Sequence, residues 1–545
     1  MTQRTRTPLL LALAAVVGTL GSAAPATGAA PATGAAPSAP TSGTPTSGTP
    51  SAGTLTAGAP APGAPVARAD ARTALPGLAW KPCATPDGPA GQECATLPVP
   101  VDYRDPDGPR LTLAVTRLRS DEPAARRGTL LMIPGGPGGS GVQHLRSKGE
   151  ALRKATAGAY DLVSFDPRGA GGSTTASCGL DPDDRHLVNL LAWPDPDGGI
   201  TGNAARARRV AEACQRHGGP VLRSMTTANE VRDIDRFRRA LGERTLSAWG
   251  VSYGSYVGAV YAQKYPQHTD RWVLDSVGDP DPARVAYGWR RNTAAGADDR
   301  FPDFAAWAAD PAREDEGLRL ARRSEDVRPQ FLALAARLDH DPKRSNVPDV
   351  PLTGNRLRQA MQVALESDTA FPALARLIRD ARDPEATPVL PPAVAGPLPD
   401  AEAAAAMAAV CNDVRWPTSV PAYRRAVAAD RARHPLTAGM PASVPACAFW
   451  KEAPVEKPTR ITDDGPSDIL IVQNLRDPAT PYAGARKMRE ALGGRARTVT
   501  VDRGGHGSYL DNGNACGDRT VTAFLRTGER PDRDTVCGAE RARGR

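Results

Sequence analysis

The order of apolar and polar residues predicts strands that alternate with helices along most of the chain after residue 75. Short apolar runs, typical of strands buried on both faces, lie at Thr129–Ile133 and Asp161–Phe165. Further strands are expected at Thr245–Trp249, Arg271–Leu274, Asp468–Gln473 and Thr498–Val501. Apolar residues at helical spacing predict helices at Ala228–Leu241, Gly254–Lys264 and Ala483–Leu492. This alternation predicts an α/β fold with a mostly parallel sheet and helices on both faces.

The long segment between Leu274 and Asp468 has few strand patterns. It contains helical patterns at Pro329–Leu338, Asn355–Leu365, Ala370–Arg382 and Ala401–Cys411. A stretch this long inside a sheet is not a loop. We therefore expect a helical cap insertion at 277–460, with the α/β core formed by 75–276 and 461–545. A cap over the C-terminal edge of the sheet would cover the edge where open α/β sheets bind ligands.

The N-terminus has the pattern of an export signal. Arg4 and Arg6 precede the apolar segment Leu9–Val17, and small residues follow it. We expect a signal peptide at 1–30, too short in its apolar part to be a stable membrane span. Residues 31–74 are rich in Ala, Pro, Gly, Ser and Thr, which predicts a disordered propeptide or spacer. The protein is then secreted, either free or held at the cell wall.

Charge adds little to this picture. The 545 residues include 68 Lys and Arg against 60 Asp and Glu, a net charge of 68 − 60 = +8. Only eight of these cations are Lys, and the Arg residues are scattered among acids rather than gathered in a basic block. This distribution argues against nucleic-acid binding.

The cysteines agree with export. The chain has eight, an even number, and no pair has the CxxC spacing of a zinc or redox site. In an oxidising compartment we expect disulfides, although eight cysteines allow 105 pairings. The simplest pairing joins nearest neighbours: Cys83 with Cys94, Cys178 with Cys214, Cys411 with Cys447, and Cys516 with Cys537.

The segment Gly250–Gly254 carries the predicted chemistry. It reads GVSYG, and it lies between a predicted strand and a predicted helix. Such a turn is too sharp for large flanking residues, and it holds its serine, here Ser252, in a strained conformation above the sheet. We predict that Ser252 is a nucleophile.

A serine nucleophile needs a base and an acid, which follow it along the chain in the order serine, acid, histidine. His506 is the only histidine after the last predicted strand, so we predict it as the base; His434, in the cap, is the weaker candidate. Asp477 follows the strand at Asp468–Gln473 and is the favoured acid, with Asp275, at the end of another strand, as its rival. An ordinary imidazole predicts activity that falls below about pH 6–7.

An oxyanion hole requires two N–H donors. We expect one from Tyr253, directly after the serine. The other should come from the glycine-rich loop after Thr129–Ile133, from Gly136 or alternatively Gly135. The loop lacks the lysine of a phosphate-binding Walker motif. We expect no metal and no cofactor, because the histidines and carboxylates show no ligand spacing.

Five motifs together resemble the secreted tripeptidyl aminopeptidases of actinomycetes, which are α/β-hydrolase serine peptidases related to prolyl aminopeptidases. The motifs read IPGGPGGSG, FDPRGAGGST, GVSYGSYVGAVYAQKYP, NLRDPATP and GGHGSYL. The resemblance runs from about Leu75 to Cys537. One departure is Pro134, where the prolyl aminopeptidases usually have histidine. By these motifs Ser252, Asp477 and His506 would be the triad, and Gly136 and Tyr253 the oxyanion donors.

The resemblance implies release of tripeptides from peptides and proteins with free N-termini. Such an enzyme must bind an ammonium group, for which a buried carboxylate is a suitable partner. Asp413 is our candidate, because the expected Cys411–Cys447 disulfide would tether it; Glu366, Asp368 and Glu402 are weaker candidates. The alternative function is an esterase or other acyl hydrolase with the same triad, since one fold supports many chemistries.

Overall fold

The computed structural model describes residues 77–84, 88–185, 191–281 and 285–539. The predicted signal peptide and the predicted disordered segment lie outside these residues. Across the described ranges, no helix combines the length and apolar character needed to cross a membrane.

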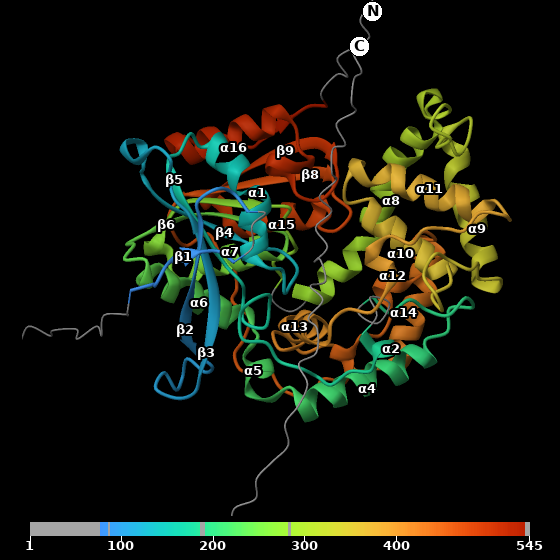
Figure 1. The fold of residues 1–545 in the computed structure, drawn as a ribbon, viewed down its shortest axis with the longest axis horizontal. Coiled ribbons are helices and arrows are strands. Elements are labelled where there is room, and N and C mark those ends of the chain that lie inside the picture. Colours follow the sequence, from blue (N-terminus) through green and yellow to red (C-terminus); the bar gives the residue numbers. More distant parts are fainter. Residues whose placement is uncertain (1–76, 85–87, 186–190, 282–284, 540–545) are drawn as a thin grey trace, which may run out of the picture. The chain divides into compact units, whose positions relative to one another are not determined.

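A single ten-stranded sheet organises the described chain (Figure 1). Its strands are β1 (Lys81–Pro82), β2 (Gln92–Pro100), β3 (Arg110–Leu118), β4 (Gly128–Ile133), β5 (Tyr160–Phe165), β6 (Leu246–Val251), β7 (Thr269–Asp275), β8 (Ile469–Arg476), β9 (Ala496–Gly504) and β10 (Thr535–Cys537). Their order in the sheet is β1-β2-β3-β5-β4-β6-β7-β8-β9-β10. The pairs from β5 to β10 are parallel, and those from β1 to β5 are antiparallel.

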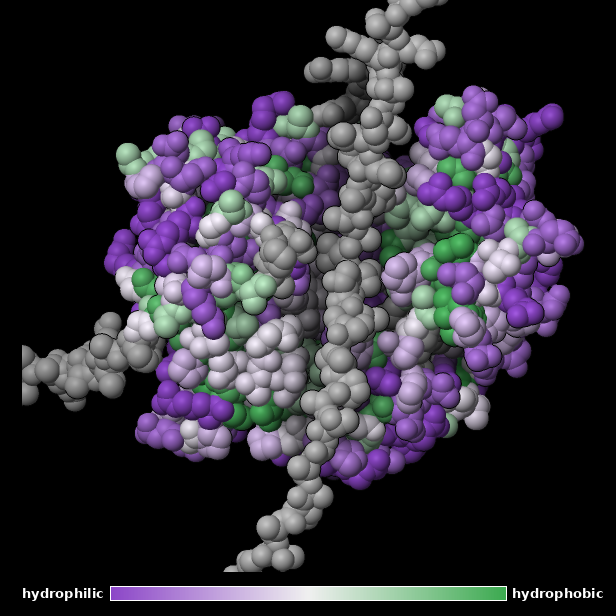
Figure 2. All heavy atoms as spheres, in the orientation of Figure 1, coloured by the Kyte–Doolittle hydropathy of each residue, from purple (hydrophilic) through white to green (hydrophobic). Residues whose placement is uncertain are grey.

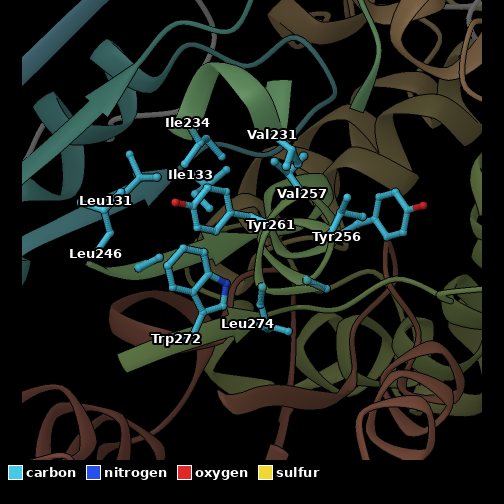
Figure 3. Packing of buried hydrophobic residues seen from close by; sticks show 14 of the residues in the cluster. Leu131, Ile133, Val231, Ile234, Leu246, Tyr256, Val257, Tyr261, Trp272 and Leu274 are labelled. Atoms are coloured by element: carbon cyan, nitrogen blue, oxygen red, sulfur yellow. The ribbon is translucent and has the colours of Figure 1, made fainter. Parts of the chain in front are cut away.

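Helices cover both faces of the sheet, which confirms the predicted fold class. They are α1 (Gly141–Ala155), α6 (Thr227–Ala240), α7 (Tyr253–Lys264), α15 (Tyr482–Leu492) and α16 (Ala515–Thr527). One face packs against α6, α7 and α15; Trp272 and Tyr261 stack there with ring centroids 5.2 Å apart (Figure 3). The other face packs against α1 and α16. The central strands are thus buried on both sides, as their continuous apolar runs require.

The segment between β7 and β8 is helical. It contains α8 (Val285–Ala309), α9 (Ser324–His340), α10 (Gly354–Ala364), α11 (Phe371–Arg382), α12 (Pro392–Ala395), α13 (Asp400–Cys411) and α14 (Val420–Arg433). Helices α8 to α11 share a hydrophobic core of their own. Hydrophilic residues cover most of the surface seen in Figure 2, with smaller hydrophobic areas between them.

A second stretch of chain, before β6, packs with these cap helices. It contains α2 (Pro182–Arg185), α4 (Thr201–His217) and α5 (Gly219–Ser224). Residues of α4 and α5 share a hydrophobic cluster with α13 and Cys447. Helices α4 and α5 thus pack with α13 of the predicted cap, although they lie within the 75–276 range assigned to the core from the sequence.

Four disulfides join nearest neighbours in the sequence: Cys83–Cys94, Cys178–Cys214, Cys411–Cys447 and Cys516–Cys537. The second and third lie in the hydrophobic cluster that α4, α5 and α13 share. Four disulfides in one chain are typical of a protein from an oxidising compartment.

Candidate active site

Ser252 lies at the turn between β6 and α7, in a backbone conformation that side chains rarely adopt. Its φ is 60° and its ψ is −126°. The turn is closed by glycines: a Cβ on Gly250 would overlap the carbonyl of Gly254, and one on Gly254 would overlap that of Ile133. The strain is thus maintained by surrounding backbone, which is typical of a functional serine at this position.

The glycine-rich loop after β4 lies against Ser252. Strand β4 pairs with β6 so that Ile133 is opposite Gly250, and the loop begins at the next residue. A Cβ built on Gly135 would lie 2.9 Å from the Cβ of Ser252 and 3.5 Å from its Oγ. The neighbouring Gly136 has a φ of +123°, a conformation that glycine adopts readily. Gly135 is therefore beside the serine, and Gly136 follows it in the same loop.

His506 and Asp477 form an ion pair on loops that leave β9 and β8. The imidazole Nδ1 lies 3.0 Å from Oδ2 and 3.1 Å from Oδ1 of the aspartate. The Asp477 side chain is fully buried and that of His506 is 16% exposed. A carboxylate at Nδ1 leaves Nε2 as the nitrogen that can accept a proton.

Thr480, which was not singled out from the sequence, contacts both members of this ion pair. Its hydroxyl donates to Oδ2 of Asp477 at 2.9 Å and also lies 3.3 Å from Nδ1 of His506. The backbone N–H groups of Ala479 and Thr480 donate to Oδ1 at 2.9 and 2.8 Å. With the Gln473 amide, which donates to Oδ2 at 3.5 Å, the Asp477 carboxylate is thus fixed by four donors besides the imidazole.

Asp275, the rival acid, binds backbone N–H groups of the histidine loop instead of the imidazole. Its carboxylate accepts from the N–H groups of Ser508 and Tyr509 at 2.8 and 2.9 Å and from the indole of Trp249 at 3.1 Å. Burial raises the pKa of this carboxyl to about 6, against the opposing effect of these donors. The structure places Asp477, not Asp275, against the imidazole nitrogen.

Charge around His506 moves its titration away from the ordinary range. Burial favours the neutral ring, but the carboxylates of Asp477, Glu366 and Asp275 outweigh it and raise the pKa of His506 to about 9. The sequence led us to expect an imidazole that titrates near pH 6–7. In the structure, the surrounding carboxylates instead keep His506 protonated into the alkaline range.

Glu366 contacts the histidine loop from the cap, on the turn after α10. Its backbone carbonyl accepts a hydrogen bond from the N–H of His506 at 2.8 Å. Its side chain keeps an exposed surface, yet protein surrounds the carboxyl closely enough that desolvation raises its pKa, against the opposing effect of His506.

Asp413 lies where the cap meets the N-terminus of α6. Its carboxylate accepts from the backbone N–H of Thr227 at 2.9 Å and from the Thr227 hydroxyl, which in turn lies 2.7 Å from the hydroxyl of Tyr253. Burial raises the pKa of the Asp413 carboxyl to about 6. Asp413 also lines a small cavity with Thr227, Tyr256 and Glu456.

The remaining candidates lie elsewhere. Asp368 is bound by Arg300 and by Arg503, and Glu402 is exposed on α13. His434 pairs with Asp298 of α8 at 2.6 Å. Of the histidine candidates, His506 is the one that the structure joins to an acid from the predicted sheet edge.

Comparisons with known proteins decide the family. The family model described as TAP-like protein matches residues 435–537. The tripeptidyl aminopeptidase of Streptomyces coelicolor is 34% identical over 493 residues, which are 86% of this chain and 88% of that protein. The chain belongs to the tripeptidyl aminopeptidase family.

Two further relatives carry different enzyme names, a serine protease and a carboxylesterase. Serine protease Hip1 of Mycobacterium tuberculosis is 29% identical over 502 residues, 86% of this chain and 93% of its own. Carboxylesterase B of the same species is 30% identical over 464 residues, 82% of this chain and 86% of its own. As a member of the tripeptidyl aminopeptidase family with the α/β-hydrolase fold, the chain is a serine hydrolase, and its peptidase relatives indicate peptide substrates.

Proposed function

We propose that the protein is a secreted serine exopeptidase that releases tripeptides from free N-termini through an acyl-enzyme on Ser252. The observation that carries the proposal is the His506–Asp477 pair at the sheet edge where Ser252 occupies a strained turn. A buried aspartate on Nδ1 and a strained serine at a helix start are the components that acyl transfer requires. The 34% identical Streptomyces relative supports the peptidase activity.

The reaction follows from these groups. His506 takes the proton of Ser252 as the hydroxyl oxygen attacks the third carbonyl of the substrate, and then gives that proton to the leaving nitrogen. Asp477 holds the ring and stabilises the imidazolium. The N–H groups of Tyr253 and Gly136, or alternatively Gly135, donate to the oxyanion. Water, activated by the same imidazole, then releases the tripeptide.

Asp413 is the proposed partner of the substrate ammonium. The Tyr253 side chain extends from the residue after the serine to Thr227, and Thr227 holds Asp413. An extended tripeptide spans about 10 Å. The side chain of Tyr253 separates Asp413 from the serine, so Asp413 could bind the ammonium of a substrate of that length. Each Asp413 oxygen accepts one bond from Thr227 and retains acceptor capacity, and an ammonium would stabilise the buried charge.

The test compares matched chromogenic substrates with the wild type and with Ser252→Ala. The substrates are one-, two- and three-residue anilides with free N-termini, an N-acetylated tripeptide anilide and a short acyl ester. Release from the free tripeptide anilide alone, lost in the alanine variant, supports the proposal. Turnover of the ester with none of the anilides would support the esterase alternative, which the carboxylesterase relative favours.

The amine site is tested by Asp413→Asn, with Asp341→Asn as the control because Asp341 is an exposed aspartate of the same cap. We expect Asp413→Asn to reduce the preference for the free over the acetylated tripeptide, and Asp341→Asn to preserve it. An unchanged preference in Asp413→Asn, with the melting temperature retained, would remove Asp413 from this role.

Secretion is supported by the four disulfides and by the N-terminal export pattern. N-terminal sequencing of protein recovered from the culture medium and from the cell wall tests it. Protein retained in the cytoplasm with Met1 intact would contradict it.

A further inference from the structure

The Glu366 carboxylate is unusual among the charges near the predicted base. The backbone of Glu366 is fixed to His506 by the 2.8 Å bond from the histidine N–H. Within the residues that the structure describes, its carboxylate forms no hydrogen bond or ion pair, and the side chain is exposed. It is therefore a charge held in place by its backbone whose counter-charge is the His506 imidazolium, and it loses that counter-charge when His506 is neutral, as a base must be.

The arginines around it are all used by other carboxylates. Arg300 is buried, donates to the carbonyl of Leu365 at 3.1 Å and binds Asp303 and Asp368. Two more arginines of the same ion-pair network are also bound to aspartates. Arg476 binds Asp303 at 2.8 Å and Asp502 at 2.7 Å, and Arg503 binds Asp368 at 3.2 Å. These three arginines are thus matched by three aspartates, which leaves Glu366 without an arginine partner among the described residues.

The same network fixes the turn that carries Glu366. Arg300 binds the carbonyl of the residue before Glu366 and the carboxylate two residues after it. Arg476, which shares Asp303 with Arg300, ends β8 one residue before Asp477. The position of Glu366 relative to the triad loops is therefore set by buried and half-buried ion pairs rather than by a flexible cap.

The position of Glu366 beside His506 identifies the part of the substrate it faces. The base must lie within about 3 Å of the nitrogen that it protonates, so the residue that begins with this nitrogen lies next to the histidine. The substrate ammonium, by contrast, is about 10 Å from the reacting carbonyl in an extended tripeptide. Glu366 lies on the cap turn whose carbonyl binds the N–H of His506, and its carboxylate interacts electrostatically with that histidine, which places it on the leaving-group side.

We propose that Glu366 forms a cation-binding subsite for the leaving group, which favours substrates with Lys or Arg directly after the cleaved bond. The proposal rests on the proposed acyl-enzyme at Ser252 with His506 as base. A side-chain ammonium or guanidinium there supplies the cation that Glu366 lacks when His506 is neutral. The new ammonium of the released chain gains from the same charge.

The subsite can be tested by acyl transfer, independently of peptide cleavage. The acyl-enzyme is formed from p-nitrophenyl acetate or from the tripeptide anilide, whichever is turned over. Lysinamide and norleucinamide, of similar length but different charge, then compete with water for it. The amine nitrogen forms a bond to the acyl carbon, the bond to Oγ of Ser252 breaks, and His506 carries the proton from the amine to that oxygen.

We expect the wild type to transfer the acyl group to lysinamide about three to five times more readily than to norleucinamide, the size expected of a partly solvated ion pair. Glu366→Gln should reduce this ratio to about one, and added salt should lower it in the wild type. Glu385→Gln, which neutralises an exposed glutamate elsewhere in the cap, should preserve it.

Equal transfer to both amides by the wild type, or an unchanged ratio in Glu366→Gln, would overturn the proposal. A Glu366→Gln enzyme that instead loses its preference for free over acetylated N-termini would overturn it as well, because Glu366 would then bind the substrate ammonium. Failure of the proposed function gives a different result: tripeptide anilides are not cleaved, while the acetyl-enzyme still prefers lysinamide.

Discussion

Asp275 binds the turn of Ser252 through its backbone and the loop of His506 through its side chain. Its carbonyl accepts from the N–H of Ser252 at 3.0 Å, and its buried carboxylate accepts from Ser508 and Tyr509, which follow the histidine. The hydroxyl of the adjacent Ser276 accepts from Gly507 at 2.9 Å. One strand end thus positions the predicted nucleophile and the predicted base relative to each other.

Replacing Asp275 by asparagine should therefore displace the base without removing a reacting group. The amide NH₂ would face one of the two backbone N–H groups, and the loop would have to move. A displacement of about 1 Å costs about 10²-fold in rate, so we expect kcat to fall by about that factor while KM changes little. Steady-state kinetics at pH 9 measure this; an unchanged kcat in a folded variant would show that the clamp does not position His506.

Asp477→Asn should be more severe, because Asp477 contacts the imidazole itself. An amide at this position stabilises the wrong tautomer and no longer balances the imidazolium, which in a comparable triad costs about 10⁴-fold. We expect a loss of about 10³- to 10⁴-fold in kcat, larger than for Asp275→Asn. The reverse order of the two variants would assign the acid to Asp275.

The pH dependence follows from the sign of the His506 shift. Its folded-state pKa is raised from 6.5 to about 9, and the base is active only when neutral, so kcat/KM should rise up to about pH 9. The ion pair stabilises the fold fully below about pH 6.5, and this contribution is lost as the pH rises through about 9. Activity that already reaches its plateau by pH 7 would contradict this environment of His506.

Thr480 should act through Asp477. Thr480→Val removes the hydroxyl that donates to Oδ2, and the loss of one such bond to a buried carboxylate corresponds to about tenfold in kcat. Thr480→Ser retains the donor and should restore most of the rate. A loss in Thr480→Ser with none in Thr480→Val would instead indicate a packing role for the methyl group.

The parts of the fold set by local patterns could be predicted from the sequence. The apolar runs of β4, β5 and β6 are short and buried on both faces, so they are recognised without tertiary information. Strand β2 was missed: Pro98 and Pro100 lie within it, and proline argues against a strand. Helix α4 was also missed, because only one narrow side of this polar helix is buried.

The site was predictable only where chain order constrains it. Ser252, Asp477 and His506 follow from a motif, two strand ends and the order of triad residues. The contact of Glu366 with the base joins segments far apart in the sequence, through the 2.8 Å bond between Glu366 and His506, so the sequence offered Glu366 only as a weaker amine-site candidate. The only local signal for Thr480 was its place in the loop three residues after Asp477. The arginine network around Glu366 has no sequence signature, because its members come from α8, η4 (Asp368–Ala370), β8 and β9.

The most direct test of the account is the identity of the first products from one unmodified peptide. A ten-residue peptide with a free N-terminus is incubated briefly with the wild type, and the products are identified by mass spectrometry, with Ser252→Ala as the control. The account predicts the N-terminal tripeptide and the complementary heptapeptide from the wild type and neither from the variant. Single amino acids, dipeptides or internal fragments as first products, or equal release by Ser252→Ala, would contradict it.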